Sequence, residues 1–551
     1  MSTRAIFCFV CMMMWLAGSS SCAGKRVAPP TPTPSPSAHV VATPLPPASP
    51  TSVRASTTAP TATRASSPTR QLPLAYPFDQ KNMFFGIGSV HRAEDAALAR
   101  ELGVTWVSAQ PMVVWFALEA EPGVYVWSSV DNDVKMLQEI GLDATMALYP
   151  INLFGDQRAQ LMSKLKASGS APDDLSNAFQ IFLRDSPESK QWNLYVHAET
   201  LPLWINFIKA AVERYDGDGK EDMPGLRYPV RNWHFGQEFP LPGWDSAPEY
   251  VQALKQTYAA IKSQDTNARV ILVGLAANYA RLFAFADGFI QDQDAGVVKG
   301  AKSSRQAIAA NPAFKKEKAE FEYILREGKN YFDVADIHLY EEKETFIEGK
   351  LDWFKHKMQE YGYTKPIWSL EGGGPLKDPP GKPTRHGDPY FGEWSAKENA
   401  ELVVKLHALG AAKGMERYHW GLAGTEDTNY WNGPWTVMGL TTSNRVKKPS
   451  YHTFKLMVEK LKGFESVKDK SFGNVRLFEF AVSHRQVYIA WSSDAIPRAY
   501  DLSAKLGNAP LIATPIVTQT QPDGKPIVSP PQPIVSTSVL LSQTPVFLEA
   551  K

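Results

Sequence analysis

Cysteine is absent from the chain after residue 22. The 551 residues include only three cysteines, Cys8, Cys11 and Cys22. The remainder therefore contains no disulfide, no thiol nucleophile and no cysteine-ligated zinc ion. It also lacks a paired-histidine zinc pattern, a glycine-rich phosphate loop and a Gly-x-Ser-x-Gly nucleophile motif. We accordingly expect no cofactor and no bound metal.

An excess of charge of either sign is also missing. The chain carries 58 Lys and Arg against 57 Asp and Glu, a formal net charge of +1. This balance gives no electrostatic reason to expect a nucleic acid or an anionic membrane surface as a partner. Hydrophobic residues make up 44% of the sequence, which is enough for sizeable cores, so two or three structural regions are expected at this length.

The apolar run at the N-terminus is too short to span a bilayer comfortably. Residues 5–18 follow Arg4 and have the charged start and small-residue exit of a secretory signal. They lead to Cys22 in a context that resembles a bacterial lipoprotein processing site, although Ser19 stands where Leu is usual. We expect residues 1–22 to direct export and Cys22 to carry the lipid that anchors the protein at the cell envelope or surface. Ordinary signal cleavage and secretion is the alternative.

Acidic residues are missing from the segment that follows. The first one is Asp79, and Pro, Thr, Ser and Ala dominate residues 27–72. A segment of this composition has too little apolar surface to form a core and stays extended and solvated. We therefore predict that residues 23–75 form a tether between the anchor and the globular part.

Short β-rich runs alternate with amphipathic helical stretches from residue 76 onward. Eight such units predict an α/β fold, a (β/α)8 TIM barrel over residues 76–462. The predicted strands are 84–90, 105–111, 143–150, 231–238, 268–277, 332–340, 366–373 and 416–422. The helical patterns are 93–102, 130–140, 203–214, 249–262, 351–361, 397–412 and 451–461. The polar insertion 155–200 has the length of a loop that shapes a binding site or forms a lid.

The pattern changes after Gly463. Short alternating strands, such as 475–482 and 486–491, are separated by turns and by a proline-rich stretch. We predict that residues 463–551 form an all-β appendage, a small sandwich packed on the barrel.

Two predicted strands end on a carboxylate. Glu238 closes the fourth strand and Glu371 closes the seventh, where Gly372, Gly373 and Gly374 follow. One such glutamate alone would most simply be a solvated or salt-bridged strand end, since Glu is seldom buried unpaired. A barrel, however, gathers the carboxyl ends of its strands around one mouth. Two carboxylates there can divide the work of glycoside cleavage, one protonating the leaving oxygen and the other attacking the anomeric carbon.

The sequence resembles the retaining glycoside hydrolases of the large (β/α)8 clan, clan A, over most of residues 82–462. Motifs in matching order carry this resemblance: Trp115 with 119–127 and Asp131, 233–238, 337–340, 365–371, and Trp420. The resemblance implies that Glu238 is the acid/base and Glu371 the nucleophile of a double displacement on a β-linked oligo- or polysaccharide. The glycine run after Glu371 would let backbone or sugar approach closely.

One position departs from the clan. Members usually carry Asn before the acid/base, where its amide binds the sugar 2-hydroxyl, and this chain has Gln237. Adjacent residues on a regular strand face opposite sides, so Gln237 and Glu238 both reach the site only if the strand bulges or ends there. A shift on the order of 1 Å can cost about 10²-fold in rate. A catalytically silent carbohydrate-binding lipoprotein with a degenerate barrel is therefore the alternative, and a third possibility makes the C-terminal β region the binding module.

Three further side chains are candidates for binding the sugar. His338 and Tyr340 have the same parity on the sixth strand, where the tyrosine could orient Glu371; a pair packed in the core is the alternative. Trp420 could form the floor beneath the sugar ring, with core packing again as the alternative. The acidic stretch 216–222 resembles part of a calcium loop but lacks its third spaced acidic residue and distal Glu, which favours a solvated turn.

Overall fold

The computed structural model describes residues 73–88, 90–151, 163, 196, 198–236, 238–240, 244, 246–291, 305–340, 343–374, 395–423, 439–507, 509–534 and 538–550. The expectations for the signal segment, for Cys22, for the tether up to residue 72, for most of the insertion 155–200 and for Gln237 lie outside these residues.

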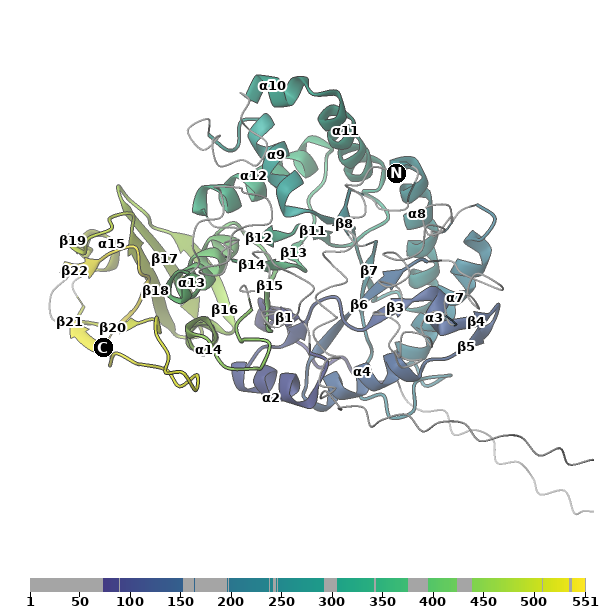
Figure 1. Ribbon diagram of the computed structural model, residues 1–551, viewed down its shortest axis with the longest axis horizontal. Coiled ribbons are helices and arrows are strands. Elements are labelled where there is room, and N and C mark those ends of the chain that lie inside the picture. Colours follow the sequence, from purple (N-terminus) through teal and green to yellow (C-terminus); the bar gives the residue numbers. More distant parts are fainter. Residues whose placement is uncertain are drawn as a thin grey trace, which may run out of the picture.

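A barrel of eight parallel strands forms the centre of the molecule, as predicted (Figure 1). Neighbouring strands run in the order β11, β13, β15, β1, β2, β6, β7, β9, and parallel bridges from Ile271 to Val334 and from Leu275 to Ile337 join the two ends of this series. The strands are β1 (Phe85–Gly88), β2 (Trp106–Val107), β6 (Asp143–Tyr149), β7 (Asn232–Phe235), β9 (Arg269–Ile271), β11 (Ala335–Asp336), β13 (Ile367–Ser369) and β15 (Arg417–Gly421).

Shorter strands extend the barrel at its carboxyl end. β8 pairs with β10, β12 pairs with β14, and β3 pairs with β6, all in parallel register. Their bounds are β3 (Met112–Val114), β8 (Glu238–Phe239), β10 (Gly274–Leu275), β12 (Leu339–Tyr340) and β14 (Gly372–Gly373); β4 (Glu119–Glu121) and β5 (Val124–Tyr125) form a separate hairpin. Several barrel strands are thus interrupted just where the predicted catalytic residues lie.

Helices form a layer outside the barrel (Figure 1). They are α2 (Ala93–Leu102), α4 (Ser128–Glu139), α7 (Leu201–Tyr215), α8 (Ala247–Gln264), α9 (Ala277–Ala286), α12 (Glu344–Glu360), α13 (Ala396–Ala412) and α14 (Pro449–Leu461), with α10 (Arg305–Ala310) and α11 (Pro312–Glu327) after α9 and the single turns η2 (Gln80–Asn82) and α3 (Trp115–Leu118). All seven predicted helices are present. The helices α9, α10 and α11, which follow the fifth strand, were not predicted from the sequence. None of the described helices is both long and apolar enough to cross a membrane.

A buried polar cluster closes the amino-terminal end of the barrel; we call it the floor cluster. The Asp143 carboxylate accepts hydrogen bonds from the Tyr76 hydroxyl (2.7 Å) and the Asn232 amide (2.8 Å) and forms an ion pair with Arg417 (3.0 Å). The Arg417 guanidinium also lies over the Trp368 ring, 3.9 Å from its centroid. Because the Asp143 carboxylate and the Arg417 guanidinium pair with one another, the cluster can stay buried without an unpaired charge. It also holds the end of the predicted tether against the barrel.

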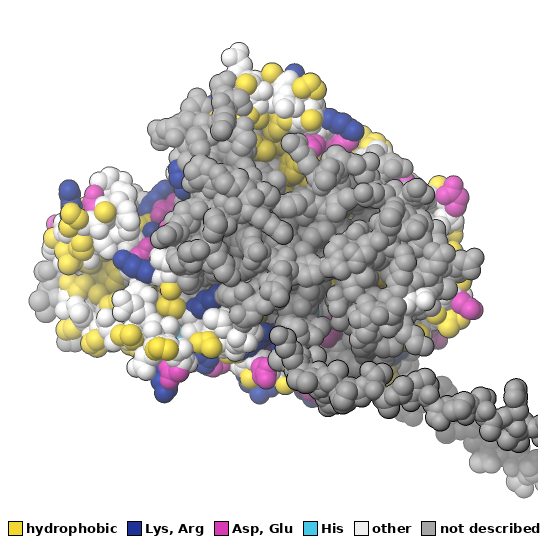
Figure 2. All heavy atoms as spheres, in the orientation of Figure 1, with side chains coloured by type: hydrophobic (Ala, Val, Ile, Leu, Met, Phe, Trp, Pro, Cys, Tyr) yellow, Lys and Arg dark blue, Asp and Glu magenta, His cyan; other side chains and the backbone are white. Residues whose placement is uncertain are grey.

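The C-terminal region is all-β. Its six-stranded sheet has the order β16 (Phe464–Asp469), β17 (Val475–Val482), β18 (Arg485–Ser492), β23 (Val546–Ala550), β20 (Leu511–Pro515), β21 (Gln532–Ile534), and β19 (Arg498–Asp501) pairs with β22 (Ser538–Leu541), while α15 (Ser503–Leu506) is a single turn. On the face seen in Figure 2, hydrophobic and charged side chains are interspersed over this region.

Contacts join the C-terminal region to the outside of the barrel. Arg476 forms ion pairs with Glu348 (2.8 Å) and Glu344 (3.5 Å) of α12, and the Trp491 indole N–H donates to Glu344 (2.9 Å). The Phe464 ring packs edge-on against Phe84 at 5.2 Å. The all-β appendage therefore packs on the barrel, as predicted.

Candidate active site

The fourth barrel strand breaks immediately before Glu238. β7 ends at Phe235, Gly236 has φ 85°, and β8 begins at Glu238. A positive φ of this size favours glycine, and a Cβ at residue 236 would lie 3.1 Å from the Tyr250 ring. The fourth strand is therefore interrupted immediately before Glu238. The sequence requires such a break if Gln237 and Glu238 are to face the same side.

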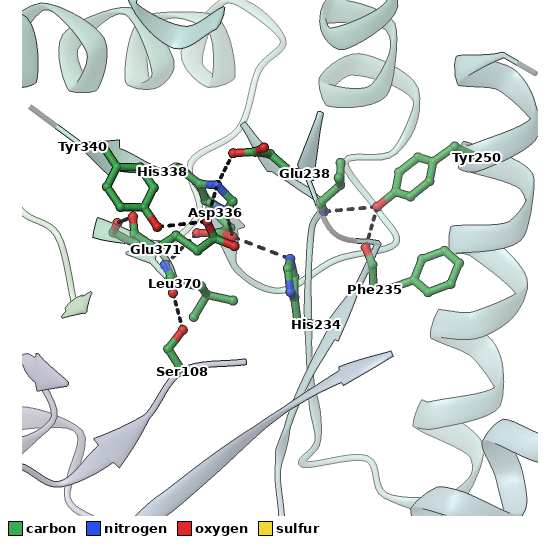
Figure 3. Close-up of polar contacts among 12 residues, drawn as sticks. Ser108, His234, Phe235, Glu238, Tyr250, Asp336, His338, Tyr340, Leu370 and Glu371 are labelled. Carbon is green, nitrogen blue, oxygen red and sulfur yellow. Dashed lines mark hydrogen bonds and ion pairs between the residues drawn. The ribbon is translucent and has the colours of Figure 1, made fainter. Parts of the chain in front are cut away.

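The Tyr250 hydroxyl occupies the gap that the break leaves. It donates to the Phe235 carbonyl (2.9 Å) and accepts from the Val273 N–H (3.1 Å), so it bridges the fourth and fifth strands where their ladder is interrupted (Figure 3). Both backbone groups are buried and would otherwise lack these partners, which is costly. A side chain from α8 thus stabilises the irregular backbone that leads into Glu238.

The seventh strand is held on both sides just before Glu371. The Leu370 N–H donates to Asp336 Oδ1 (2.9 Å), and the Ser108 hydroxyl donates to the Leu370 carbonyl (Figure 3). The Ser369 hydroxyl donates to the carbonyl of Glu371 itself (2.7 Å). These contacts fix the backbone from which the Glu371 side chain projects.

Glu238 and Glu371 face one another across the barrel mouth. Their nearest carboxylate oxygens and a nitrogen of His338 all lie within 4.8 Å of one another. His338 Nδ1 lies 2.6 Å from Glu238 and 3.4 Å from Glu371, and the Tyr340 hydroxyl donates to Glu371 Oε2 at 3.1 Å. Both carboxylates retain some exposure, 13% for the Glu238 side chain and 18% for Glu371. The structure therefore brings together four of the predicted site residues around one small space.

The charges in this space shift the pKa values of two groups. Burial raises the pKa of Glu371 to about 7; the His338 charge opposes this, and Glu238 and Asp336 add to it. Burial alone would lower the pKa of His338, but Glu371, Asp336 and Glu238 together raise it well above its usual value. The three carboxylates thus favour the imidazolium form of His338, whose Nδ1 lies between Glu238 and Glu371.

Trp420 lies elsewhere than predicted. It is fully buried on β15, and its ring is 5.6 Å from that of His407 on α13. Tyr418, two residues earlier, stacks on the same His407 ring at 4.4 Å, whereas the intervening residues on the strand face the barrel interior. These contacts favour packing between strand and helix layer over a sugar platform for Trp420.

Two buried residues beside the pair, Asp336 and His234, were not among the site residues predicted from the sequence. Asp336 Oδ2 lies 3.3 Å from His338 Nε2 and 3.6 Å from His234 Nε2. Burial lowers the pKa of His234 to about 4, so this ring is neutral at pH 7. One signal was available: Asp336, His338 and Tyr340 alternate along the sixth strand, which places three polar groups on one face.

The motif after the second strand holds the β4–β5 hairpin together. The Trp115 indole donates to the buried Glu119 carboxylate, which also accepts from the Gly123 N–H (2.6 Å). Asp131 pairs with Arg214 (2.6 Å) of α7. None of these contacts involves Glu238 or Glu371, so these residues support the hairpin and its neighbouring helices.

The acidic stretch after α7 forms a turn. Carboxylate oxygens of Asp216, Asp218 and Asp222 lie within 4.8 Å of one another and could hold a cation. Asp222, however, accepts from the N–H groups of Gly217 (3.0 Å) and Gly219 (2.9 Å). These bonds within the turn fit the solvated turn that the sequence favoured.

The described site is therefore a (β/α)8 barrel mouth with two facing glutamates on the fourth and seventh strands. No protein-family model matches the sequence, and no curated protein matches it. Among solved structures, the chain is similar to a family 39 glycoside hydrolase from Bacteroides cellulosilyticus WH2, with a TM-score of 0.55 at 15% identity over 87% of this chain and 83% of the other.

Two other similar structures superpose less closely. One is a bifunctional glucanase-xylanase from a metagenome library, with a TM-score of 0.48, 11% identity and coverage of 87% and 96%. The other is a monomeric β-xylosidase from Caulobacter crescentus CB15, with a TM-score of 0.46, 14% identity and coverage of 87% and 98%. At 15% identity, the likeness to the family 39 glycoside hydrolase concerns the fold, and the predicted (β/α)8 barrel is confirmed at that level.

Proposed function

We propose that the protein is a retaining glycoside hydrolase that cleaves O-glycosidic bonds of a β-linked oligo- or polysaccharide. Glu238 serves as the acid/base and Glu371 as the nucleophile. The fold shared with a family 39 glycoside hydrolase supports the reaction class. The chemistry of the two glutamates, argued below, supports the mechanism.

The separation of the two carboxylates carries this proposal. Their nearest oxygens lie within 4.8 Å of one another. Retaining enzymes hold the two carboxyl groups about 5–5.5 Å apart, whereas inverting enzymes leave about 6.5–9.5 Å for a water molecule. The spacing supports direct attack by one carboxylate on the anomeric carbon.

The reaction then proceeds in two displacements. Glu238 gives its proton to the leaving oxygen while Glu371 attacks the anomeric carbon and forms a glycosyl ester. Glu238, now ionised, takes a proton from a water molecule that attacks the same carbon and releases Glu371. The Tyr340 hydroxyl, 3.1 Å from Glu371, orients the attacking carboxylate. Because the pair must hold one proton between them, we expect activity to fall as pH rises through about 7, the value to which burial raises the pKa of Glu371.

The first test is hydrolysis of activated aryl glycosides, followed by polysaccharides, with a fragment beginning at about Tyr76. Glu371→Gln and Glu238→Gln should each lose turnover by at least about 10³-fold on unactivated substrates. Full activity in Glu371→Gln would overturn the mechanism. Specific binding of an oligosaccharide without turnover of any substrate would support the silent binding protein instead, which the replacement of the usual Asn by Gln237 motivates.

A second measurement separates the two roles. In Glu238→Ala, aryl glycosides with very good leaving groups should still form the glycosyl ester, because they need no proton, and added azide should release a product of retained configuration. In Glu371→Ala, azide should attack in place of the carboxylate and give the opposite configuration. Identical products from the two variants would contradict the assignment.

We further propose that the protein is exported and anchored through a lipid on Cys22. The support is the order of signal, cysteine and solvated tether in the sequence. Labelling with a radioactive or clickable fatty acid should mark the wild-type chain and not Cys22→Ser. Labelling of neither chain would favour ordinary signal cleavage and secretion, and equal labelling of both would show that the lipid is not on Cys22.

A further inference from the structure

Asp336 is a buried carboxylate at the centre of the barrel mouth. Its side chain is fully inaccessible on β11, and among the described residues no Lys or Arg forms an ion pair with it. An unpaired charge in such a place would cost several kcal/mol, on the order of the penalty for one buried ion. Its contacts must therefore account for its presence.

Each carboxylate oxygen of Asp336 contacts a group that lies next to one of the two glutamates. Oδ1 accepts from the Leu370 N–H (2.9 Å), the residue directly before Glu371. Oδ2 faces His338 Nε2 (3.3 Å), and the other nitrogen of that ring lies 2.6 Å from Glu238. We propose that Asp336 is a positioning residue for both glutamates, holding the strand end that carries Glu371 and fixing the His338 ring between the two carboxylates. This inference rests on the proposed function.

The surroundings of His338 leave the three carboxylates as its charged neighbours. His234 from β7 and His419 from β15 face the same interior, and burial lowers their pKa values to about 4 and about 3, so both are neutral at pH 7. The Tyr340 hydroxyl from β12 is uncharged as well. Among these groups, the His338 ring is therefore the one that can offset the charge on Asp336 and on whichever of Glu238 and Glu371 is ionised, and its orientation decides where the positive charge lies.

The fifth strand provides the space for this arrangement. Gly274 lies opposite Glu238 in the β8–β10 pairing. A Cβ on residue 274 would overlap His338 Nε2 and lie 2.6 Å from Asp336 Oδ2. Any side chain at residue 274 would therefore push the His338 ring and the Asp336 carboxylate apart. It would leave the charges of both groups unchanged.

Asp336→Asn tests the proposal because it keeps the shape and removes the charge. Asp336 is one of the charges that raise the pKa of Glu371 and of His338, so without it both groups should give up their protons at lower pH. We expect kcat/KM to fall about 10- to 100-fold with KM little changed, and the alkaline limb of the pH profile to move down by about one unit.

Asp143→Asn is the matched control, because Asp143 is equally buried but lies in the floor cluster at the other end of the barrel. It should lower stability without moving the pH profile. A folded Asp336→Asn protein with an unshifted alkaline limb would overturn the proposal and leave Asp336 a structural residue. If Asp336→Asn does not fold, Gly274→Ala takes its place: wild-type kinetics in that variant would also overturn the proposal, and a rate loss of about 10-fold or more would support it.

A spectroscopic measurement keeps the inference separate from the proposed function. With ¹⁵N-labelled histidine, the His338 resonances are identified by their loss in His338→Gln. In the wild type they should remain those of an imidazolium at pH 8, and in Asp336→Asn they should become neutral at lower pH. Identical titrations would overturn the inference whether or not the protein cleaves glycosides, whereas full activity of Glu371→Gln would overturn the function alone.

Discussion

The hydroxyl of Tyr340 is the one phenol placed to orient the proposed nucleophile among the described residues. Tyr340→Phe removes its 3.1 Å hydrogen bond to Glu371 and keeps the ring. We expect kcat to fall about 10- to 100-fold, because a carboxylate that rotates freely attacks from the wrong geometry, with little change in KM. Steady-state kinetics on an aryl glycoside measures this.

Tyr258→Phe is the matched control for Tyr340. It removes a phenol that donates to Asp333 (3.3 Å), away from the pair. Unchanged kinetics there and a reduced kcat in Tyr340→Phe would show that the effect belongs to Glu371. Equal kinetics for both variants would remove Tyr340 from the proposed site.

Glu371 should also make folding sensitive to pH. Its pKa is raised by burial to about 7 in the folded protein, above the unfolded value, so its contribution to stability is fully present below about pH 4.5 and is lost as pH rises through about 7. Glu371→Gln should therefore unfold at a higher temperature than the wild type at pH 8, by about 1–2 °C, since the lost attraction to His338 offsets part of the gain. The two Tm values should converge toward pH 4.5. A constant difference across this range would contradict the shifted pKa.

At the scale of an element, the broken fourth strand depends on a helix side chain. Tyr250→Phe leaves the Phe235 carbonyl and the Val273 N–H, both buried, without their hydroxyl partner. The expected cost is about 1–3 kcal/mol of unfolding free energy, together with a lower kcat, because β8 carries Glu238. Urea unfolding and steady-state kinetics measure the two effects.

Tyr363→Phe is the comparison for this element. It also removes a phenol that donates to a backbone carbonyl, that of Leu325 (2.9 Å), but its partner lies on α11, outside the barrel mouth. It should lose stability without losing kcat. A normal kcat in Tyr250→Phe would show that the break tolerates the missing bond.

The strands were predictable because their signal is local. The run 143–150 is apolar apart from Asp143 and Thr145, as is typical of a strand buried on both faces, and β6 is buried along its whole length. The helix α9 was less visible because it begins at Ala277, where the apolar strand pattern was read as continuing. Local patterns identify elements well, but they do not mark the junction between two apolar ones.

The site was only partly predictable for a different reason. Glu238 and Glu371 stand at strand ends. The functional residues of parallel barrels gather at the carboxyl ends of the strands, so this position could be recognised from the sequence. Asp336 stands within a strand, and its contacts with Leu370 and His338 depend on which strands become neighbours and on the glycine at residue 274. Trp420 was assigned to the sugar because a strand-end indole fits that role, yet side-chain alternation turns it toward His407.

At the scale of the whole molecule, the C-terminal β region completes the outer surface of the barrel. Deleting residues after Gly463 would remove Phe464 from Phe84 and leave Glu344 and Glu348 without Arg476. We expect the truncated chain to be recovered mainly as insoluble aggregate, because it exposes an apolar surface that the full chain covers.

Arg476→Ala is the milder companion, since it removes the ion pairs and keeps the aromatic contact. It should remain soluble and keep the wild-type kcat. A soluble truncated barrel that still binds or cleaves sugar would show instead that the appendage is dispensable, and it would also remove the reading in which this region is the binding module.

The floor cluster and the two glutamates lie at opposite ends of the barrel. Tyr76, which follows the predicted tether, is fixed to Asp143 where the barrel strands begin, whereas Glu238 and Glu371 stand where the strands end. In a protein anchored at Cys22, the tether would join the barrel at the end opposite the two glutamates. The attachment and the proposed sugar site would then not compete for the same end of the barrel.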